Sequence, residues 1–392
     1  MFQIVPDNIN IDFMRANRVF APLSVLLVAL SVALTAVLGL NYGIDFLGGY
    51  EIQVKLAEPV SEARLREIVA PLNLGDVRVQ RFGAVADNEY LVFVREHATL
   101  DEAQKAALKA DFEALYGGGE LPKWAVAESG ENITVEFGTA VSEAQVREVV
   151  QRRGLALKRI MRSEREDRPE YAIELVSLAD KVEAAVRDGL SVPAESQIVR
   201  RVEFVGPQVG AQLREQGILA TVYALLFILL YIAVRFDLFF APGAIIALVH
   251  DVAITVGAFA LFRLEFNLQT IAALLPLVGY SINDTIIVYD RIRENVVRLR
   301  GRELTAMVNT SINQTLSRTI WTSGTTLFVT VALWVFGGET LRPFAIALTL
   351  GIVVGTYSSI QIASPIYIKL RAYAERRAQR AGERVAATGG QS

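Results

Sequence analysis

The 392-residue sequence contains no cysteine and only two histidines, His97 and His250. Without cysteine there is neither a disulfide framework nor a thiolate metal site, and two histidines are few for a zinc site. The sequence also lacks a Gly-x-x-x-x-Gly-Lys loop, so it indicates no nucleotide site. Its net charge of −3 shows no basic excess. We therefore expect no cofactor, no metal ion and no nucleic-acid partner.

Charge is scarce over long windows of the chain, although 21% of all residues are charged and 52% are hydrophobic. A helix needs about 20 apolar residues to cross a bilayer core. Six windows meet this requirement: 19–40, 217–234, 238–262, 268–289, 319–337 and 343–370. The first is too long for a cleaved signal peptide and ends without a small-residue cleavage pattern, so we predict a retained span. The sequence thus predicts an α-helical polytopic membrane protein with six transmembrane helices.

Lysine and arginine are distributed unequally between the two sides of these spans. If the N-terminus is cytoplasmic, the same side receives the basic segment 291–302 and the basic tail 371–392, whereas the short loops of the other side carry only Arg263 and Arg342. We therefore predict that both termini, including residues 1–18, are cytoplasmic. Residues 42–212 are then predicted to be periplasmic.

The predicted periplasmic segment carries an internal repeat. Residues 60–69 read Val-Ser-Glu-Ala-Arg-Leu-Arg-Glu-Ile-Val, and residues 141–150 read Val-Ser-Glu-Ala-Gln-Val-Arg-Glu-Val-Val. Each copy follows one strand-like run and precedes two more and a helical stretch, the β-α-β-β-α order of a ferredoxin-like unit. We predict two α+β ferredoxin-like units, 42–127 and 131–205, between the first transmembrane helix (19–40) and a five-helix region (214–370).

Two acidic residues lie inside predicted spans. Asp284 lies in the fourth span, where an ionised carboxylate costs about 2.5–3.5 kcal/mol and normally pairs with another group or carries a proton. Asp251 lies near the middle of the third span, and two roles for it are open. It takes part in a proton relay, or it is a structural hydrogen-bond acceptor for Asn283 or for hydroxyl groups of the fifth span. A metal-hydrolase pair of His250 and Asp251 would need further ligands that the spans lack.

Several motifs together resemble one family. They are Gly-Ile-Asp-Phe-Leu-Gly-Gly at 43–49, Val-Gly-Pro-Gln-Val-Gly at 205–210, Gly-Tyr-Ser-Ile-Asn-Asp-Thr at 279–285, Arg-Thr at 318–319 and Thr-Ser-Gly-Thr-Thr at 322–326. In this order they resemble SecF, the smaller partner of SecD in the bacterial Sec secretion apparatus. The resemblance implies a six-span protein of the resistance-nodulation-division superfamily in the bacterial inner membrane. It implies no enzyme, but a subunit that uses the proton-motive force to promote late-stage preprotein translocation.

The resemblance also implies a proton pathway. The family's motif aspartate falls on Asp284, and its fifth-span arginine falls on Arg318. Burial favours a neutral carboxyl group and a nearby guanidinium favours the ionised form, so the separation of the two groups would decide when a proton is held. A static buried ion pair is the alternative. Thr322, Thr325 and Thr326 follow at near-helical spacing and either line a polar stripe toward Asp284 or satisfy helix–helix contacts.

The implied partners are a SecD-like subunit in a heterodimer, the SecYEG translocon, the translocating preprotein and the lipid bilayer. Six spans are half of the superfamily's pseudo-symmetric unit, so a SecD-like partner is expected to complete the bundle. The chain departs from the family in having two ferredoxin-like units where one is typical, so contacts of that domain are not carried over. Two other functions are a resistance-nodulation-division small-molecule exporter half and a non-energised translocon scaffold. Drug susceptibility distinguishes the first, and tolerance of neutral substitutions at Asp284 and Arg318 distinguishes the second.

Overall fold

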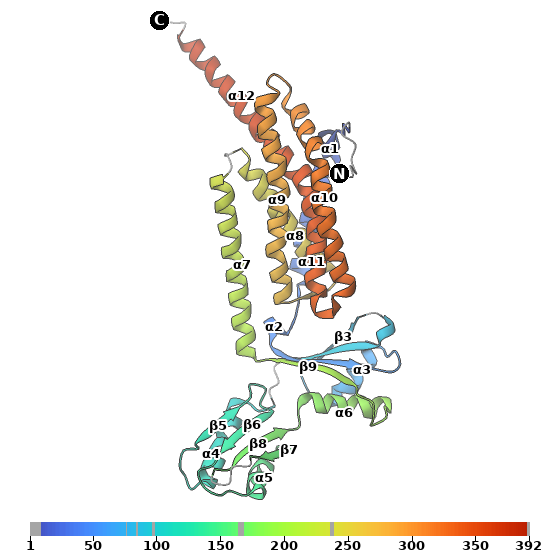
Figure 1. Ribbon diagram of the computed structural model, residues 1–392, viewed down its shortest axis with the longest axis vertical. Helices are drawn as coiled ribbons and strands as arrows, with labels where there is room; N and C mark the ends of the chain where they lie inside the picture. The colour runs from blue at the N-terminus through green and yellow to red at the C-terminus, as the bar shows by residue number, and fades with distance from the viewer. Residues whose placement is uncertain are drawn as a thin grey trace. The chain divides into compact units, whose positions relative to one another are not determined.

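The structure is a computed structural model that describes residues 9–75, 77–83, 85–95, 99–163, 168–235 and 239–389 (Figure 1). The outermost residues of the two predicted cytoplasmic ends and the first residue of the predicted third span, Leu238, lie outside these ranges. The chain divides into two compact units. One combines the chain up to Gly43 with the chain from Glu215 onward, and the other is Ile44–Arg214.

Long helices make up the first unit. They are α1 (Phe13–Leu38), α7 (Pro207–Arg235), α8 (Ala241–Leu261), α9 (Leu268–Arg298), α10 (Leu304–Phe336), α11 (Gly338–Ser358) and α12 (Ser364–Gly389), with a π-helix (Ser359–Ala363) between the last two. Six helical segments in the described residues are long and apolar enough to cross a membrane, the sixth being the continuous Thr340–Arg377. The prediction of six transmembrane helices is therefore confirmed. The last helix continues to Gly389, through most of the predicted tail.

Helices α8, α9 and α11 form the interior of this bundle. Gly351 and Gly355 bring α11 against α9: a Cβ atom on Gly351 would lie 2.1 Å from Leu277 Cδ1, and one on Gly355 would lie 3.2 Å from Ser281 Cβ. Small residues at a spacing of four allow such close helix approach in membranes. In contrast, α1, α7 and α10 are largely exposed in the isolated chain.

The chain that follows α1 is tied to the loop before α9. Strand β1 (Asn41–Tyr42) pairs in parallel with β10 (Glu265–Phe266). The guanidinium of Arg263 donates to the carbonyl oxygen of Leu38 over 2.8 Å, at a helix end whose carbonyls lack intrahelical partners. The end of α1 is thus held to the bundle by backbone and side-chain bonds.

The second unit contains two four-stranded antiparallel sheets. The first has β2 (Gly49–Lys55), β3 (Val77–Phe82), β4 (Glu89–Val94) and β9 (Val199–Val205) in the order β3-β4-β2-β9. The second has β5 (Lys123–Val126), β6 (Asn132–Glu136), β7 (Leu157–Arg162) and β8 (Glu170–Leu175) in the order β5-β6-β8-β7. Helices α3 (Glu62–Val69) and α6 (Leu178–Leu190) pack on the first sheet, and α4 (Glu102–Leu115) and α5 (Glu143–Arg152) pack on the second (Figure 1). Both are ferredoxin-like, and the inserted α+β region of the predicted fold class is confirmed.

The predicted boundaries 42–127 and 131–205 are wrong, because the two units are not consecutive along the chain. Val182 and Val186 of α6 are fully buried in the core of the first sheet, and β9 pairs with β2. Leu108 and Phe112 of α4 are fully buried in the core of the second sheet. The first ferredoxin-like unit is therefore split by the second, which begins after β4 and ends before α6.

The sequence repeat has a matching structural repeat. The hydroxyl of Tyr90 on β4 donates to the carbonyl oxygen of Val60 over 2.6 Å, and that of Tyr171 on β8 donates to Val141 over 2.6 Å. Each accepting residue directly precedes a serine N-cap, so the two copies begin their first helix in the same way.

The Gly48-Gly49 pair is required by backbone conformation. Gly48 has a φ of +71° and Gly49 a φ of +110°, which side chains disfavour. A Cβ atom on Gly49 would also lie 2.3 Å from the carbonyl oxygen of Val94. The pair therefore lets β2 begin tightly against the end of β4.

Candidate functional site

Helix α8 brings Asp251 into the bundle interior. Gly243, Ala247, Asp251 and Thr255 stand four residues apart and are all buried, so they share one face of the helix. The two small residues let neighbouring elements approach: a Cβ atom on Gly243 would lie 2.3 Å from the hydroxyl of Tyr289 on α9. Asp251 is 0% exposed on this face.

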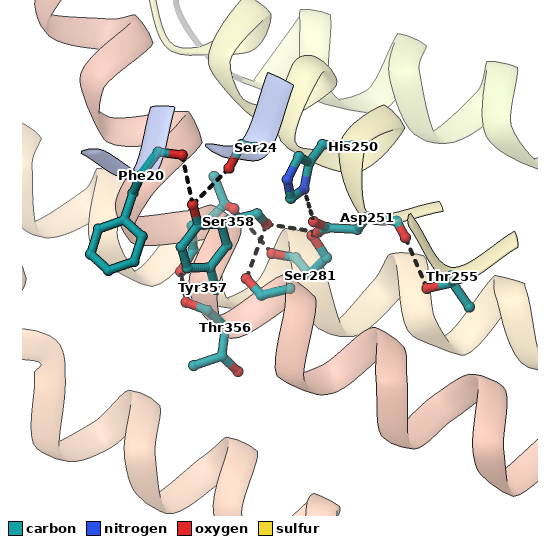
Figure 2. Close-up of polar contacts among 12 residues, drawn as sticks. Phe20, Ser24, His250, Asp251, Thr255, Ser281, Thr356, Tyr357 and Ser358 are labelled. Atoms are coloured by element: carbon teal, nitrogen blue, oxygen red, sulfur yellow. Dashed lines mark hydrogen bonds and ion pairs between the residues drawn. The ribbon is translucent and has the colours of Figure 1, made fainter. Parts of the chain in front are cut away.

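Asp251 receives hydrogen bonds from two helices. Ser281 Oγ of α9 donates to Asp251 Oδ2 over 2.5 Å, and Ser358 Oγ of α11 lies 2.7 Å from the same oxygen (Figure 2). On the other oxygen, His250 Nδ1 lies 2.8 Å from Asp251 Oδ1. Asp251 is therefore hydrogen-bonded on both oxygens, to α9, to α11 and to its own neighbour on α8.

The prediction that Asn283 or fifth-span hydroxyls bond Asp251 is wrong. The hydroxyl partners come from the fourth and sixth spans, and the Asn283 side chain is exposed. Residues two positions apart on a helix, such as Ser281 and Asn283, point about 200° apart around its axis. Asn283 therefore points away from the side on which Ser281 meets Asp251.

Asp284 is the second buried carboxylate and is 4% exposed. Ser323 Oγ of α10 donates to Asp284 Oδ2 over 3.3 Å, and Thr356 Oγ1 of α11 lies 2.8 Å from Ser323 Oγ. A chain of hydroxyls therefore joins Asp284 to two neighbouring helices. Because Ser281 and Asp284 are one turn apart on α9, both buried carboxylates act on the same helix.

Arg318 does not pair with Asp284 in this structure. Its side chain is exposed, and among the described residues no ion pair within 4.0 Å joins Arg318 to a carboxylate. Arg318 precedes Ser323 by five residues, which places it about 140° around α10 from the hydroxyl that faces Asp284. The two residues that the motif associates are thus on neighbouring helices but point in different directions.

Three threonines of the predicted polar stripe serve mainly their own helix. The hydroxyls of Thr322 and Thr325 donate to α10 carbonyl oxygens, and Thr326 Oγ1 lies 2.9 Å from the hydroxyl of Tyr280. Sequence reasoning missed Ser323. A signal was available, because Thr319, Ser323, Thr326 and Thr330 recur at helical spacing and mark the inward side of α10.

His250 is a further buried group that the motifs do not include. It is 4% exposed, and its ring lies 6.0 Å from the ring of Tyr357 on α11. The hydroxyl of Tyr357 donates to the carbonyl oxygen of Phe20 over 3.1 Å and lies 2.6 Å from Ser24 Oγ, both on α1 (Figure 2). Among the described residues, His250 Nε2 is a buried nitrogen without a hydrogen-bond partner.

The described residues contain no group of three histidine or acidic side chains arranged to hold a metal ion. Among the described residues, the polar side chains buried in the bundle include the carboxyl groups of Asp251 and Asp284, the imidazole of His250, several hydroxyls and the amides of Asn267, Asn295 and Gln361.

Comparisons with known proteins find matches near the N-terminus and in the C-terminal half of this chain. Residues 33–60 match the family model "SecD/SecF GG Motif". Residues 188–373 match the model "Protein export membrane protein SecD/SecF, C-terminal", and this range includes Asp251, Asp284 and Arg318. A protein translocase subunit SecF from Koribacter versatilis is 38% identical over 95% of this chain and 94% of its own length. The SecF subunit from Calditerrivibrio nitroreducens is 36% identical over 95% of this chain and 98% of its own length. This chain belongs to the SecF family.

The SecF fold is also seen in a solved structure. The crystal structure of SecDF from Thermus thermophilus, described as a translocon-associated membrane protein, matches with a TM-score of 0.65 and 31% identity. The match covers 94% of this SecF chain but only 40% of the SecDF chain. This SecF-family chain is therefore a multi-pass membrane protein that corresponds to less than half of the solved polypeptide.

Proposed function

We propose that this chain is a proton-driven subunit of the Sec protein-export apparatus, which acts with a SecD-like partner to promote late-stage preprotein translocation across the inner membrane. The observation that carries the proposal is the burial of Asp284 on α9. Among the described residues, its carboxyl group accepts from the hydroxyl of Ser323 on α10, which in turn is bonded to Thr356 on α11. Intramembrane carboxylates facing a bundle interior are typical of proton relays in pumps and transporters.

The membrane potential supplies enough energy for such a role. Moving one proton across it yields about 2.3 kcal/mol per 100 mV. This energy shifts a two-state equilibrium by more than about tenfold. Asp284 is placed to use it, because its hydroxyl contacts reach two neighbouring helices whose packing would respond to its charge.

We propose that Arg318 pairs with Asp284 only when the carboxylate is ionised. A guanidinium favours an ionised carboxylate and gains little from a neutral one. The separation of the two side chains in this structure is then the arrangement in which Asp284 holds its proton. Loss of the proton would draw Arg318 toward Asp284 and turn α10 against α9.

The proposed partners are a SecD-like subunit, SecYEG and the preprotein. The SecD-like subunit is supported by the length of the solved SecDF chain, of which this chain matches 40%, and by the exposed apolar surfaces of α1, α7 and α10. An even number of spans puts both termini on one side of the membrane. We propose that this side is the cytoplasm and that residues 42–212 are periplasmic, which the bias of arginine and lysine supports.

The test is preprotein export under a fixed proton gradient, at matched membrane abundance, for the native chain and for Asp284→Asn. The matched control is Asp290→Asn, which makes the same chemical change at an exposed position of the same helix. We expect Asp284→Asn to lower gradient-dependent export by more than about tenfold, and the control to leave it unchanged. Native export by Asp284→Asn would refute the proton-driven role and favour the scaffold.

A further inference from the structure

His250 and Asp251 form a buried pair that the Asp284 site does not use. They are neighbours on α8, their side chains are joined over 2.8 Å, and they are 4% and 0% exposed. Asp251 accepts from the hydroxyls of Ser281 and Ser358 on its other oxygen. The carboxylate is thus hydrogen-bonded on both of its oxygens.

The unpartnered nitrogen of His250 indicates where a proton would bind. When Nδ1 carries the hydrogen bonded to Asp251, Nε2 of a neutral imidazole is an acceptor with a free lone pair. Among the described residues, no polar atom within hydrogen-bond distance occupies that lone pair. A buried polar atom without a partner is costly, so its persistence in a packed bundle calls for an explanation.

We propose that His250 and Asp251 form a second proton-binding site, in which a proton binds at His250 Nε2 and is shared with Asp251. This inference rests on the proposed proton-driven function. Uptake of one proton at Nε2 gives an imidazolium beside the carboxylate, and the Nδ1 proton then shifts to Asp251 Oδ1. In this step an Nε2–H bond and an Asp251 O–H bond form and the Nδ1–H bond breaks. The pair takes up one proton overall, and the hydrogen bond between the two side chains is retained.

A change in the protonation of His250 and Asp251 would alter the contacts of three helices. A neutral Asp251 holds the hydroxyls of Ser281 on α9 and Ser358 on α11 less strongly, because bonds to charged acceptors are the stronger ones. Tyr357, whose ring lies beside that of His250, is hydrogen-bonded through its hydroxyl group to Ser24 on α1. Protonation at His250 is therefore placed to change the packing of α1, α9 and α11 together.

Among the described residues, few other titratable groups lie near this pair. Helix α8 packs against α1, α9, α11, the π-helix and α12. In the part of the chain that the structure describes, these elements place Tyr357 beside His250, Tyr289 against Gly243 and Tyr367 against Phe240 at the start of α8. Asp284 lies one turn beyond Ser281, and the guanidinium of Arg371 on α12 lies over Phe239, just before α8. The buried polar residues of the π-helix, Ser359 and Gln361, are uncharged. Proton binding at the pair thus depends mainly on its own two members.

Two substitutions separate proton binding from a structural role. In His250→Asn, the side-chain amide nitrogen replaces Nδ1 as a donor to Asp251 but does not bind a proton. In His250→Ala, both properties are lost. We expect both variants to lower gradient-dependent export at least about tenfold, a typical loss for removing a positioned proton-transfer group. If His250→Asn exports normally and His250→Ala does not, His250 only orients Asp251 and the inference fails.

A spectroscopic measurement on the native chain tests the site independently of export. The full chain, labelled with ¹⁵N-histidine and co-reconstituted with its SecD-like partner, is examined by solid-state NMR between about pH 8 and about pH 5. The His250 signal is the one absent from the His250→Asn chain, or, if that variant does not assemble, from His250→Gln. We expect Nε2 to gain a proton in this range, and an Nε2 that stays unprotonated throughout overturns the inference. The export assay of Asp284→Asn separates this inference from the proposed function. Native export by Asp284→Asn would overturn the proposed function, whereas the NMR measurement alone decides whether His250 binds a proton.

Discussion

The exchange of helices between the two ferredoxin-like units predicts an unusual response to Phe112→Ala. Phe112 lies on α4, which follows β4 of the first sheet along the chain, yet its side chain is fully buried in the core of the second sheet. Its ring lies 5.9 Å from the ring of Trp124 and 6.0 Å from that of Phe137. The substitution should therefore destabilise strands that come later in the chain.

The magnitude follows from the size of the cavity. Truncating a fully buried phenylalanine to alanine costs about 3–5 kcal/mol, and the lost aromatic contacts place this site within that range rather than below it. A loss of 3 kcal/mol in local stability accelerates amide exchange by roughly a hundredfold in the affected unit. Hydrogen-exchange mass spectrometry of the full chain measures this effect separately for each strand.

We expect amides of β6 and β8 to lose protection in Phe112→Ala while those of β2 and β4 keep it. The reciprocal control is Val182→Ala on α6, which removes buried atoms from the first core and should cost roughly 2 kcal/mol. Its effect should fall on the first sheet, including β2 and β4, and leave β6 and β8 protected. Loss of protection in β2 and β4 of Phe112→Ala would show that α4 packs on the first sheet and would refute this topology.

Two further predictions concern the membrane unit and the orientation of the chain. Gly351→Val should push α11 away from Leu277 and lower the amount of assembled protein by at least about twofold. Gly279→Ala should be neutral, because an added Cβ atom meets nothing within 4 Å there. Immunoblotting of membranes measures the abundance of both variants, and equal abundance would contradict the close contact at Gly351. Because the chain has no native cysteine, Ala125→Cys should react with an impermeant maleimide from the periplasm and Tyr373→Cys only after the membrane is opened. Labelling of Tyr373→Cys in intact cells would contradict the predicted orientation.

The sequence predicted the elements better than it predicted their partners. Apolar length alone located the six spans, and alternation with the 60–69 repeat located the strands, because both signals are local. The choice of sheet for α4 and α6 is not local. Each helix has an apolar face that fits a ferredoxin-like sheet, and the repeat gives no information on which of two similar sheets receives it.

The site shows the same difference. Asp251 and Asp284 could be found because a carboxylate in an apolar span is conspicuous in any sequence. Their hydroxyl partners could not be assigned, because serine and threonine also bond their own helix, as Thr322 and Thr325 do here. The position of Arg318 depends on the rotation of α10 about its axis, which packing in the bundle sets.

The pairing of β2 with β9 has a mechanical consequence. Strand β2 begins shortly after α1, strand β9 ends just before α7, and the paired residues nearest to both helices are Gly49 and Val205. Both connections to the membrane therefore leave from the same end of one antiparallel ladder. A force that separates α1 from α7 would load the Gly49–Val205 pair first and open the ladder pair by pair, like a zipper, instead of shearing all its bonds at once. The second ferredoxin-like unit is connected at both ends to the first ferredoxin-like unit and would therefore bear none of this load.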